Sequence, residues 1–250
     1  MTRPSFDDLT DVYEAMIDWP RRLAGDEPFF RPLFEEAAAR RVADVACGTG
    51  HHAAMFHSWG LHVEASDVSA NMIHRARRKF GEPGGLHWSV RGFEEPIPAD
   101  EPFDAVTCLG NSLALAGCRE LARRAVGNMV AALRPGGLLV FHVLNVWRLA
   151  DGPCLWQKCL RTALPQGDSL ITKGVQRVGD RAFVHLVVAP LDAPEDFRSE
   201  SVPFLALEAE ELGDFVQSAG AGNIRLYGNH KRGDYDRLSS VDLILVARKN

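Results

Sequence analysis

Between residues 40 and 144 the chain alternates short apolar runs with segments of helical periodicity. The apolar runs cover residues 41–46, 61–66, 86–91, 103–109 and 138–144. The intervening segments 51–59, 69–80 and 118–133 have the spacing of amphipathic helices. Strands that alternate with helices form βαβ units, which place the strands parallel in one sheet with helices on its faces. The order of these segments therefore predicts an α/β fold.

The pattern changes after residue 149. Residues 169–172 and 181–188 flank a Val-Gly-Asp turn at 178–180, and residues 199–205 form a further strand-like run. Such short runs around a glycine turn are typical of antiparallel strands. A predicted helix at 207–219 and two predicted strands at 224–227 and 241–247 then close the chain.

We therefore expect a Rossmann-like, mostly parallel seven-stranded sheet with helices on both faces, plus a small antiparallel β insertion at about 150–205. Residues 1–250 would form a single domain. Its expected parts are N-terminal cap helices (1–39), a ligand-binding core (40–149), the insertion or lid (150–205) and the closing helix and strands (206–250).

Composition excludes several classes of protein. The formal net charge of −5 argues against nucleic acid as the main partner, because phosphate binding requires a basic surface. No apolar run approaches the roughly 18 residues of a membrane span, and the first ten residues do not resemble a signal peptide. The five cysteines show no C-x-x-C spacing, so we expect neither disulfides nor a metal site. A cytoplasmic location fits best.

The strongest local signal is the sequence DVACGTG at residues 44–50, where a strand ends in a glycine turn. Glycines there let the backbone approach a ligand closely, and amides at the following helix can donate hydrogen bonds. Asp67 ends the next strand, and a carboxylate at that position can bind the hydroxyls of a ribose. Gly48, Gly50 and Ala53 also satisfy the dinucleotide pattern G-x-G-x-x-A, so these features alone leave the cofactor open.

Two further blocks narrow the choice: FDAVTCLGNS at residues 103–112 and LRPGGLLV at residues 133–140. Together with DVACGTG, in this order, they resemble the class I superfamily of methyltransferases that use S-adenosylmethionine (SAM). The run CLGNS at 108–112 is similar to the glycine and glycine/sarcosine N-methyltransferase group. The resemblance covers about residues 10–148 and implies that the cofactor is SAM.

The resemblance also implies roles for individual residues. Ala46, Gly48 and Gly50 would line the methionine part of SAM, while Asp67 would bind the ribose and Val68 would pack on the adenine. Gly92 and Phe93 would also meet the adenine, and the carbonyl groups of Leu109 and Gly110 would accept from the SAM amino group. In the N-terminal segment 13–22, Tyr13 would close over the sulfonium and Arg22 would pair with the SAM carboxylate. The expected cofactor-binding residues are Tyr13, Trp19, Arg22, Asp44, Ala46, Gly48, Thr49, Gly50, Asp67, Val68, Gly92, Phe93, Leu109 and Gly110.

The expected catalytic residues are Asn111, Tyr13 and His142. Methyl transfer from a sulfonium is an in-line displacement, so alignment of the reacting atoms is the main requirement. With an amine acceptor, Asn111 and Tyr13 would position the nitrogen. A hydroxyl acceptor would need a general base, for which His142 is the best-placed candidate.

The identity of the small-molecule acceptor stays open. The glycine methyltransferases carry an arginine just after the fifth strand that holds the acceptor carboxylate, but here Arg148 falls a few residues later. Trp147 and Trp156 would instead line an apolar acceptor pocket or pack at the base of the insertion. We expect the insertion to set acceptor selectivity and to supply the contacts of any homo-oligomer. The alternatives are an O-methyltransferase, a nicotinamide-dependent oxidoreductase and a SAM-binding protein without turnover.

Overall fold

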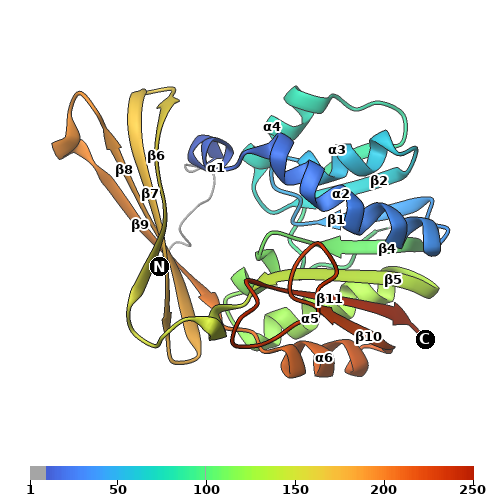
Figure 1. Ribbon diagram of the computed structural model, residues 1–250. Helices are drawn as coiled ribbons and strands as arrows, with labels where there is room; N and C mark the ends of the chain where they lie inside the picture. Colours follow the sequence, from blue (N-terminus) through green and yellow to red (C-terminus); the bar gives the residue numbers. More distant parts are fainter. Residues whose placement is uncertain (1–9, 99) are drawn as a thin grey trace.

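The computed structural model describes residues 10–98 and 100–250 (Figure 1). Its α-helices are α1 (Thr10–Met16), α2 (Trp19–Glu36), α3 (His51–Ser58), α4 (Ala70–Phe80), α5 (Arg119–Ala132) and α6 (Ala209–Ser218). Short 3-10 helices cover Ser112–Leu115, Val146–Arg148 and Pro194–Asp196. The strands are β1 (Arg41–Val45), β2 (His62–Asp67), β3 (Leu86–Val90), β4 (Phe103–Cys108), β5 (Leu133–Leu144), β6 (Cys154–Leu164), β7 (Gly167–Val178), β8 (Arg181–Pro190), β9 (Arg198–Leu205), β10 (Ala221–Tyr227) and β11 (Asp242–Lys249).

The larger sheet has seven strands in the order β10-β11-β5-β4-β1-β2-β3. Strands β1 to β5 pair in parallel, and β11 is antiparallel to both β5 and β10. Helices α2, α3 and α4 cover one face and α5 and α6 the other (Figure 1). Because both faces are covered, the central strands are buried almost throughout, as their continuous apolar sequence predicts.

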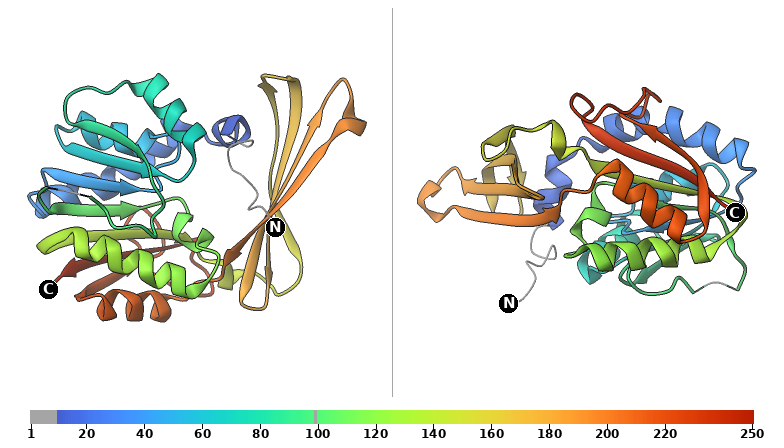
Figure 2. Two further views of the ribbon diagram at one scale, coloured as in Figure 1. Left: turned by 180° about the vertical axis from the view of Figure 1, so that it is seen from behind. Right: turned by 90° about the horizontal axis from the view of Figure 1, so that it is seen from below.

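The smaller sheet is antiparallel, in the order β6-β7-β8-β9, and it projects from one end of the larger sheet (Figures 1 and 2). The expected fold class is therefore confirmed. The turn predicted at residues 178–180 joins β7 to β8, and Gly179 there has a φ of 61°. Strand β6, which the sequence did not predict, pairs with β7 along the edge of the sheet. Its residues are mostly exposed, so β6 lacks the alternating apolar pattern that would have identified it.

The start of β5 corrects a second expectation. The sequence predicted that the Arg-Pro-Gly-Gly segment at 134–137 would lie outside the strand, before residue 138. Instead β5 begins at Leu133, which pairs with Phe103, and the pairing resumes between Leu138 and Ala105. Residues 134–137 form an irregularity within the strand, and the left-handed φ of 74° at Gly136 lets the chain rejoin its partner.

Candidate functional site

The carboxyl ends of β1, β2 and β4 meet at one edge of the sheet, where parallel α/β folds bind their ligands. The loop after β1 has three left-handed residues: Ala46 and Gly48, each with φ 57°, and Gly50, with φ 83°. Alanine adopts this conformation only at a cost of about 1 kcal/mol or more, so surrounding contacts hold the loop in this shape. Helix α3 begins directly after Gly50, which places its first amides at the same edge.

Asp67 at the end of β2 binds this glycine loop directly. Its Oδ2 accepts from the Gly48 N–H at 2.8 Å, and its Oδ1 accepts from the Ser69 N–H at 2.9 Å. The two strongest sequence signals, the glycine loop and the acid, thus lie in contact. Beside them, the side chains of Val68 and Val90 are 66% and 55% exposed at the ends of β2 and β3. An apolar surface next to a fixed carboxylate can receive a flat base attached to a sugar.

The N-terminal segment lies over the glycine loop. The Tyr13 hydroxyl oxygen is 3.7 Å from the point that a Cβ at Gly48 would occupy, and the rings of Tyr13 and Trp19 are 6.0 Å apart. Burial raises the pKa of Tyr13 well above its usual value, which the charge of Arg22 only partly offsets, so the phenol is neutral. Trp19 stacks on His51 at 3.9 Å.

Arg22 is oriented by the buried carboxylate of Asp26, which lies four residues later on α2 and was not among the predicted site residues. Its Nε donates to Oδ2 of Asp26 at 2.7 Å. Asp26 also contacts His52 at 2.9 Å and His230 at 3.4 Å. Burial alone would raise the pKa of Asp26, but the His52 hydrogen bond and the Arg22 charge lower it to about 2. The terminal nitrogens of the anchored guanidinium stay available to a ligand, since neither forms a hydrogen bond or an ion pair with a described residue.

Glu14 is a second residue that sequence reasoning missed. It accepts a short hydrogen bond from the Thr49 hydroxyl and contacts His51 at 3.1 Å. Burial opposes its charge, but the hydrogen bonds from His51 and Thr49 lower the pKa of Glu14 to about 2. The contact ties α1 to the glycine loop. The hydrogen bond to Glu14 uses the proton of the Thr49 hydroxyl, so Thr49 can offer a ligand its backbone and the lone pairs of its hydroxyl oxygen.

Asp44, at the carboxyl end of β1, is fully enclosed. Its Oδ1 accepts from the Thr107 hydroxyl at 2.7 Å, while its Oδ2 has no partner within residues 10–98 and 100–250. Burial raises the pKa of Asp44 to about 6, which the charge of His52 and the Thr107 hydrogen bond only partly oppose. A buried carboxylate oxygen without a partner fits a cationic ligand group.

The loop after β4 is held by β5. His142 accepts from the Gly110 N–H at Nδ1, 3.2 Å away, and its Nε2 donates to Asp242 at 3.1 Å. Both ring nitrogens are therefore engaged, and the ring offers no lone pair to an acceptor proton. Asn111 accepts from the Leu144 N–H at 2.9 Å through its Oδ1, so a ligand can still use the second lone pair of this oxygen and the amide nitrogen.

The remaining residues that the sequence predicted to contact the cofactor are Leu109, Gly110, Gly92 and Phe93. The Leu109 carbonyl accepts from both the backbone and the hydroxyl of Ser112, so Gly110 is the more available carbonyl for a ligand. Gly92 is buried and donates to Glu95 at 3.1 Å, and Phe93 packs against the core beneath α5. Within the described residues no group of His, Cys, Asp and Glu is arranged to hold a metal ion, and no helix is long and apolar enough to cross a membrane.

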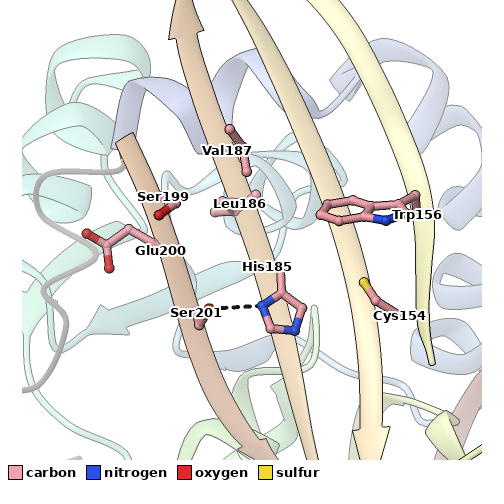
Figure 3. A pocket seen from close by; sticks show the side chains of 8 residues that line it. All are labelled: Cys154, Trp156, His185, Leu186, Val187, Ser199, Glu200 and Ser201. Carbon is pink, nitrogen blue, oxygen red and sulfur yellow. Dashed lines mark hydrogen bonds between the residues drawn. The ribbon is translucent and has the colours of Figure 1, made fainter. Parts of the chain in front are cut away.

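A separate hollow lies on the outer face of the antiparallel sheet (Figure 3). There His185 bridges Ser201 and Gln176, each at 2.9 Å, next to the exposed ring of Trp156. Trp156 therefore lies on the face turned away from the glycine loop. This position disagrees with its predicted role in lining an acceptor pocket.

Residues 42–137 match the family model described as "Methyltransferase domain". The glycine/sarcosine N-methyltransferase of Parasynechococcus marenigrum (strain WH8102) is 34% identical over 148 residues, which are 58% of this chain and 52% of that protein. Residues 42–137 therefore have the sequence of a methyltransferase domain. This result confirms the resemblance inferred from the motifs, and the cofactor of the superfamily is SAM.

Two further comparisons extend the similarity. A dTDP-4-amino-2,3,4,6-tetradeoxy-D-glucose N,N-dimethyltransferase from Saccharopolyspora spinosa is 31% identical over 140 residues, covering 54% of each chain. The solved structure of the CcbJ methyltransferase from Streptomyces caelestis shares the fold, with a TM-score of 0.74, 20% identity and 90% of each chain covered. The chain spans about half the length of the curated relatives it matches.

The residues at the glycine loop fit SAM chemically. The buried indole N–H of Trp19 has no acceptor within the described part of the chain, and the anchored Arg22 lies close enough for its charge to affect Tyr13. Both groups suit a carboxylate, while the unpartnered oxygen of Asp44 suits an ammonium group. A zwitterionic amino acid moiety carries both charges.

Proposed function

We propose that this protein transfers the methyl group of SAM to the nitrogen of a small amine. The observation that carries the proposal is the contact between Gly48 and Asp67 beneath the Tyr13 ring. This contact brings together, at one edge of the sheet, the glycine loop, a carboxylate that can bind the ribose, and an aromatic ring that lies over both. The similarity to N-methyltransferases that act on glycine and on an amino sugar supports nitrogen as the acceptor atom.

SAM supplies a methyl group on a positively charged sulfur. In our proposal the chain holds its amino acid moiety with Arg22, Trp19 and Asp44, and its ribose with Asp67. Tyr13, neutral because it is buried, covers the reacting centre and excludes water. Alignment of this kind can lower a barrier by several kcal/mol in favourable cases. The second lone pair of the Asn111 amide oxygen would accept an N–H of the incoming amine, which leaves the lone pair of the amine nitrogen free to attack the methyl group.

The contacts of His142 disfavour O-methylation with that residue as the base. A general base needs an accessible lone pair, whereas the Gly110 N–H occupies Nδ1 and Asp242 receives the Nε2 proton. We infer instead that His142 positions the loop at residues 109–111. An amine that reaches the site as the neutral base needs no proton acceptor of this strength.

A methyl-transfer screen tests the proposal. The protein is incubated with SAM carrying a tritiated methyl group and with panels of amines, amino acids, amino sugars, phenols and thiols. We expect radioactivity in amine products only, and calorimetric binding of S-adenosylhomocysteine without a response to NAD. Transfer to phenols alone would refute nitrogen as the acceptor atom. Binding of NAD in place of S-adenosylhomocysteine, or binding without any turnover, would refute the proposed activity.

We also propose a cytoplasmic location. All five cysteines are free thiols, at Cys47, Cys108, Cys118, Cys154 and Cys159. Reduced cysteines are usual in a reducing compartment. Fractionation of producing cells, followed by immunodetection, tests this point, and recovery from an oxidising compartment would contradict it.

A further inference from the structure

One lysine of the antiparallel sheet faces inward without a carboxylate partner. Along β7, Ile171, Lys173 and Val175 share one face because alternate residues of a strand point the same way. Ile171 and Val175 are completely or almost completely buried, and Val175 belongs to the core that also covers the seven-stranded sheet. The outer hollow of Figure 3 is built on the opposite face, which includes Gly174. Lys173 is thus directed toward the body of the protein.

A second lysine stands directly opposite it. Lys158 of β6 pairs in register with Lys173, although like charges at opposed positions destabilise a sheet. Lys158 also donates a short hydrogen bond to the carbonyl of Met16, the last residue of α1. The lysine pair therefore lies against the helix that carries Tyr13 over the glycine loop.

The surroundings of Lys173 are cationic. Burial lowers its pKa, and the charges of Lys158 and Arg22 lower it further. None of the ion pairs formed within residues 10–98 and 100–250 includes Lys173. A largely enclosed ammonium group among other cations is costly unless an anion reaches it. Arg22 and Trp19 already account for the SAM carboxylate in the proposed function, so an anion bound at Lys173 would belong to another ligand.

We propose that Lys173, assisted by Lys158, binds an anionic group of the methyl acceptor. The inference rests on the proposed function and narrows its substrate class to amines that also carry a carboxylate or a phosphate. The antiparallel insertion would then select the acceptor by charge, while the glycine loop of the seven-stranded sheet holds SAM.

Two matched pairs of acceptors test this inference with the complete chain. Glycine is compared with glycinamide, and glucosamine 6-phosphate with glucosamine. We expect the wild type to prefer the anionic member of at least one pair by tenfold or more in kcat/KM, and the preferred pair distinguishes carboxylate from phosphate. Lys173→Met should remove that preference. The expected loss is roughly 10- to 100-fold, because the substitution removes one hydrogen bond between charged groups. Lys173→Arg should retain most of it.

Two controls separate this inference from the proposed function. S-adenosylhomocysteine should bind Lys173→Met within about twofold of the wild type, which also shows that the variant is folded. Lys231→Met removes the same charge from an exposed loop and should preserve the preference. The inference is wrong if the wild type methylates amines without preferring anions, if the preference survives in Lys173→Met, or if that variant loses S-adenosylhomocysteine affinity instead. A wild type that methylates no amine refutes the proposed function itself.

Discussion

Alanine at position 50 should destabilise the fold far more than alanine at position 48. Gly50 has φ 83°, and an added Cβ would lie 2.5 Å from Cη2 of Trp88 and 2.9 Å from the Cβ of Ala76. The left-handed conformation costs a non-glycine residue roughly 1–2 kcal/mol. Overpacking against a buried tryptophan adds about 1–3 kcal/mol. We therefore expect Gly50→Ala to lower the free energy of unfolding by roughly 2–5 kcal/mol.

Gly48→Ala is the matched control. Gly48 has φ 57°, but its added Cβ would make only an ordinary 3.7 Å contact with the Tyr13 hydroxyl. Gly48→Ala should therefore cost roughly 1–2 kcal/mol for the left-handed conformation, with no cost for overpacking. Its methyl group would instead intrude on the proposed ligand cradle. Urea denaturation monitored by tryptophan fluorescence measures both losses, and calorimetry with S-adenosylhomocysteine measures binding. Equal losses of stability, or wild-type affinity in Gly48→Ala, would refute this reasoning.

Three further substitutions test other parts of the site. Asp67→Ala removes the partner of the Gly48 N–H and the proposed ribose acceptor, so calorimetry should show S-adenosylhomocysteine binding weakened by more than about tenfold; unchanged affinity would remove Asp67 from the site. Burial raises the pKa of Asp44 from 3.8 to about 6, so its contribution to the free energy of unfolding should decline as pH rises from about 4 to 6, by roughly 3 kcal/mol. Asp44→Asn should keep the Thr107 hydrogen bond, and its free energy of unfolding should not show this decline with pH. Urea titrations at several pH values measure the free energy of unfolding of both proteins. The same dependence on pH in both would contradict the assignment of the decline to Asp44. His142→Gln should lower kcat/KM by about 3- to 10-fold, because the hydrogen bond that holds the Gly110 loop is changed, and the dependence of kcat/KM on pH should stay the same. If the fall of kcat/KM at acidic pH disappears in this variant, His142 acts as a base after all.

The sequence by itself predicted the fold class and which loops would form the candidate site. Continuous apolar runs separated by amphipathic helices predict parallel strands buried on both faces, and β1 to β5 form such a sheet. The ends of β1 and β2 must then lie side by side. The contact between Gly48 and Asp67 follows from that adjacency, although the two residues are 19 positions apart. Local periodicity and turn chemistry are sufficient for predictions of this kind.

Tertiary structure alone decided how the charged groups pair. Arg22 and Asp26 are four residues apart on α2, a spacing that favours an ion pair, but nothing near Asp26 in sequence indicates that it also contacts His52 and His230, which come from two other segments. Likewise, only the chain fold shows that Asp242 and Gly110 occupy both nitrogens of His142, and for this reason we propose a positioning role for this residue in place of the predicted base. The charge and hydrogen-bond partners of a side chain depend on distances across the whole fold, whereas strand and helix patterns depend on near neighbours. For that reason the sequence was sufficient to identify the glycine loop, and only the fold revealed which side chains around it have hydrogen-bonding groups left for a ligand.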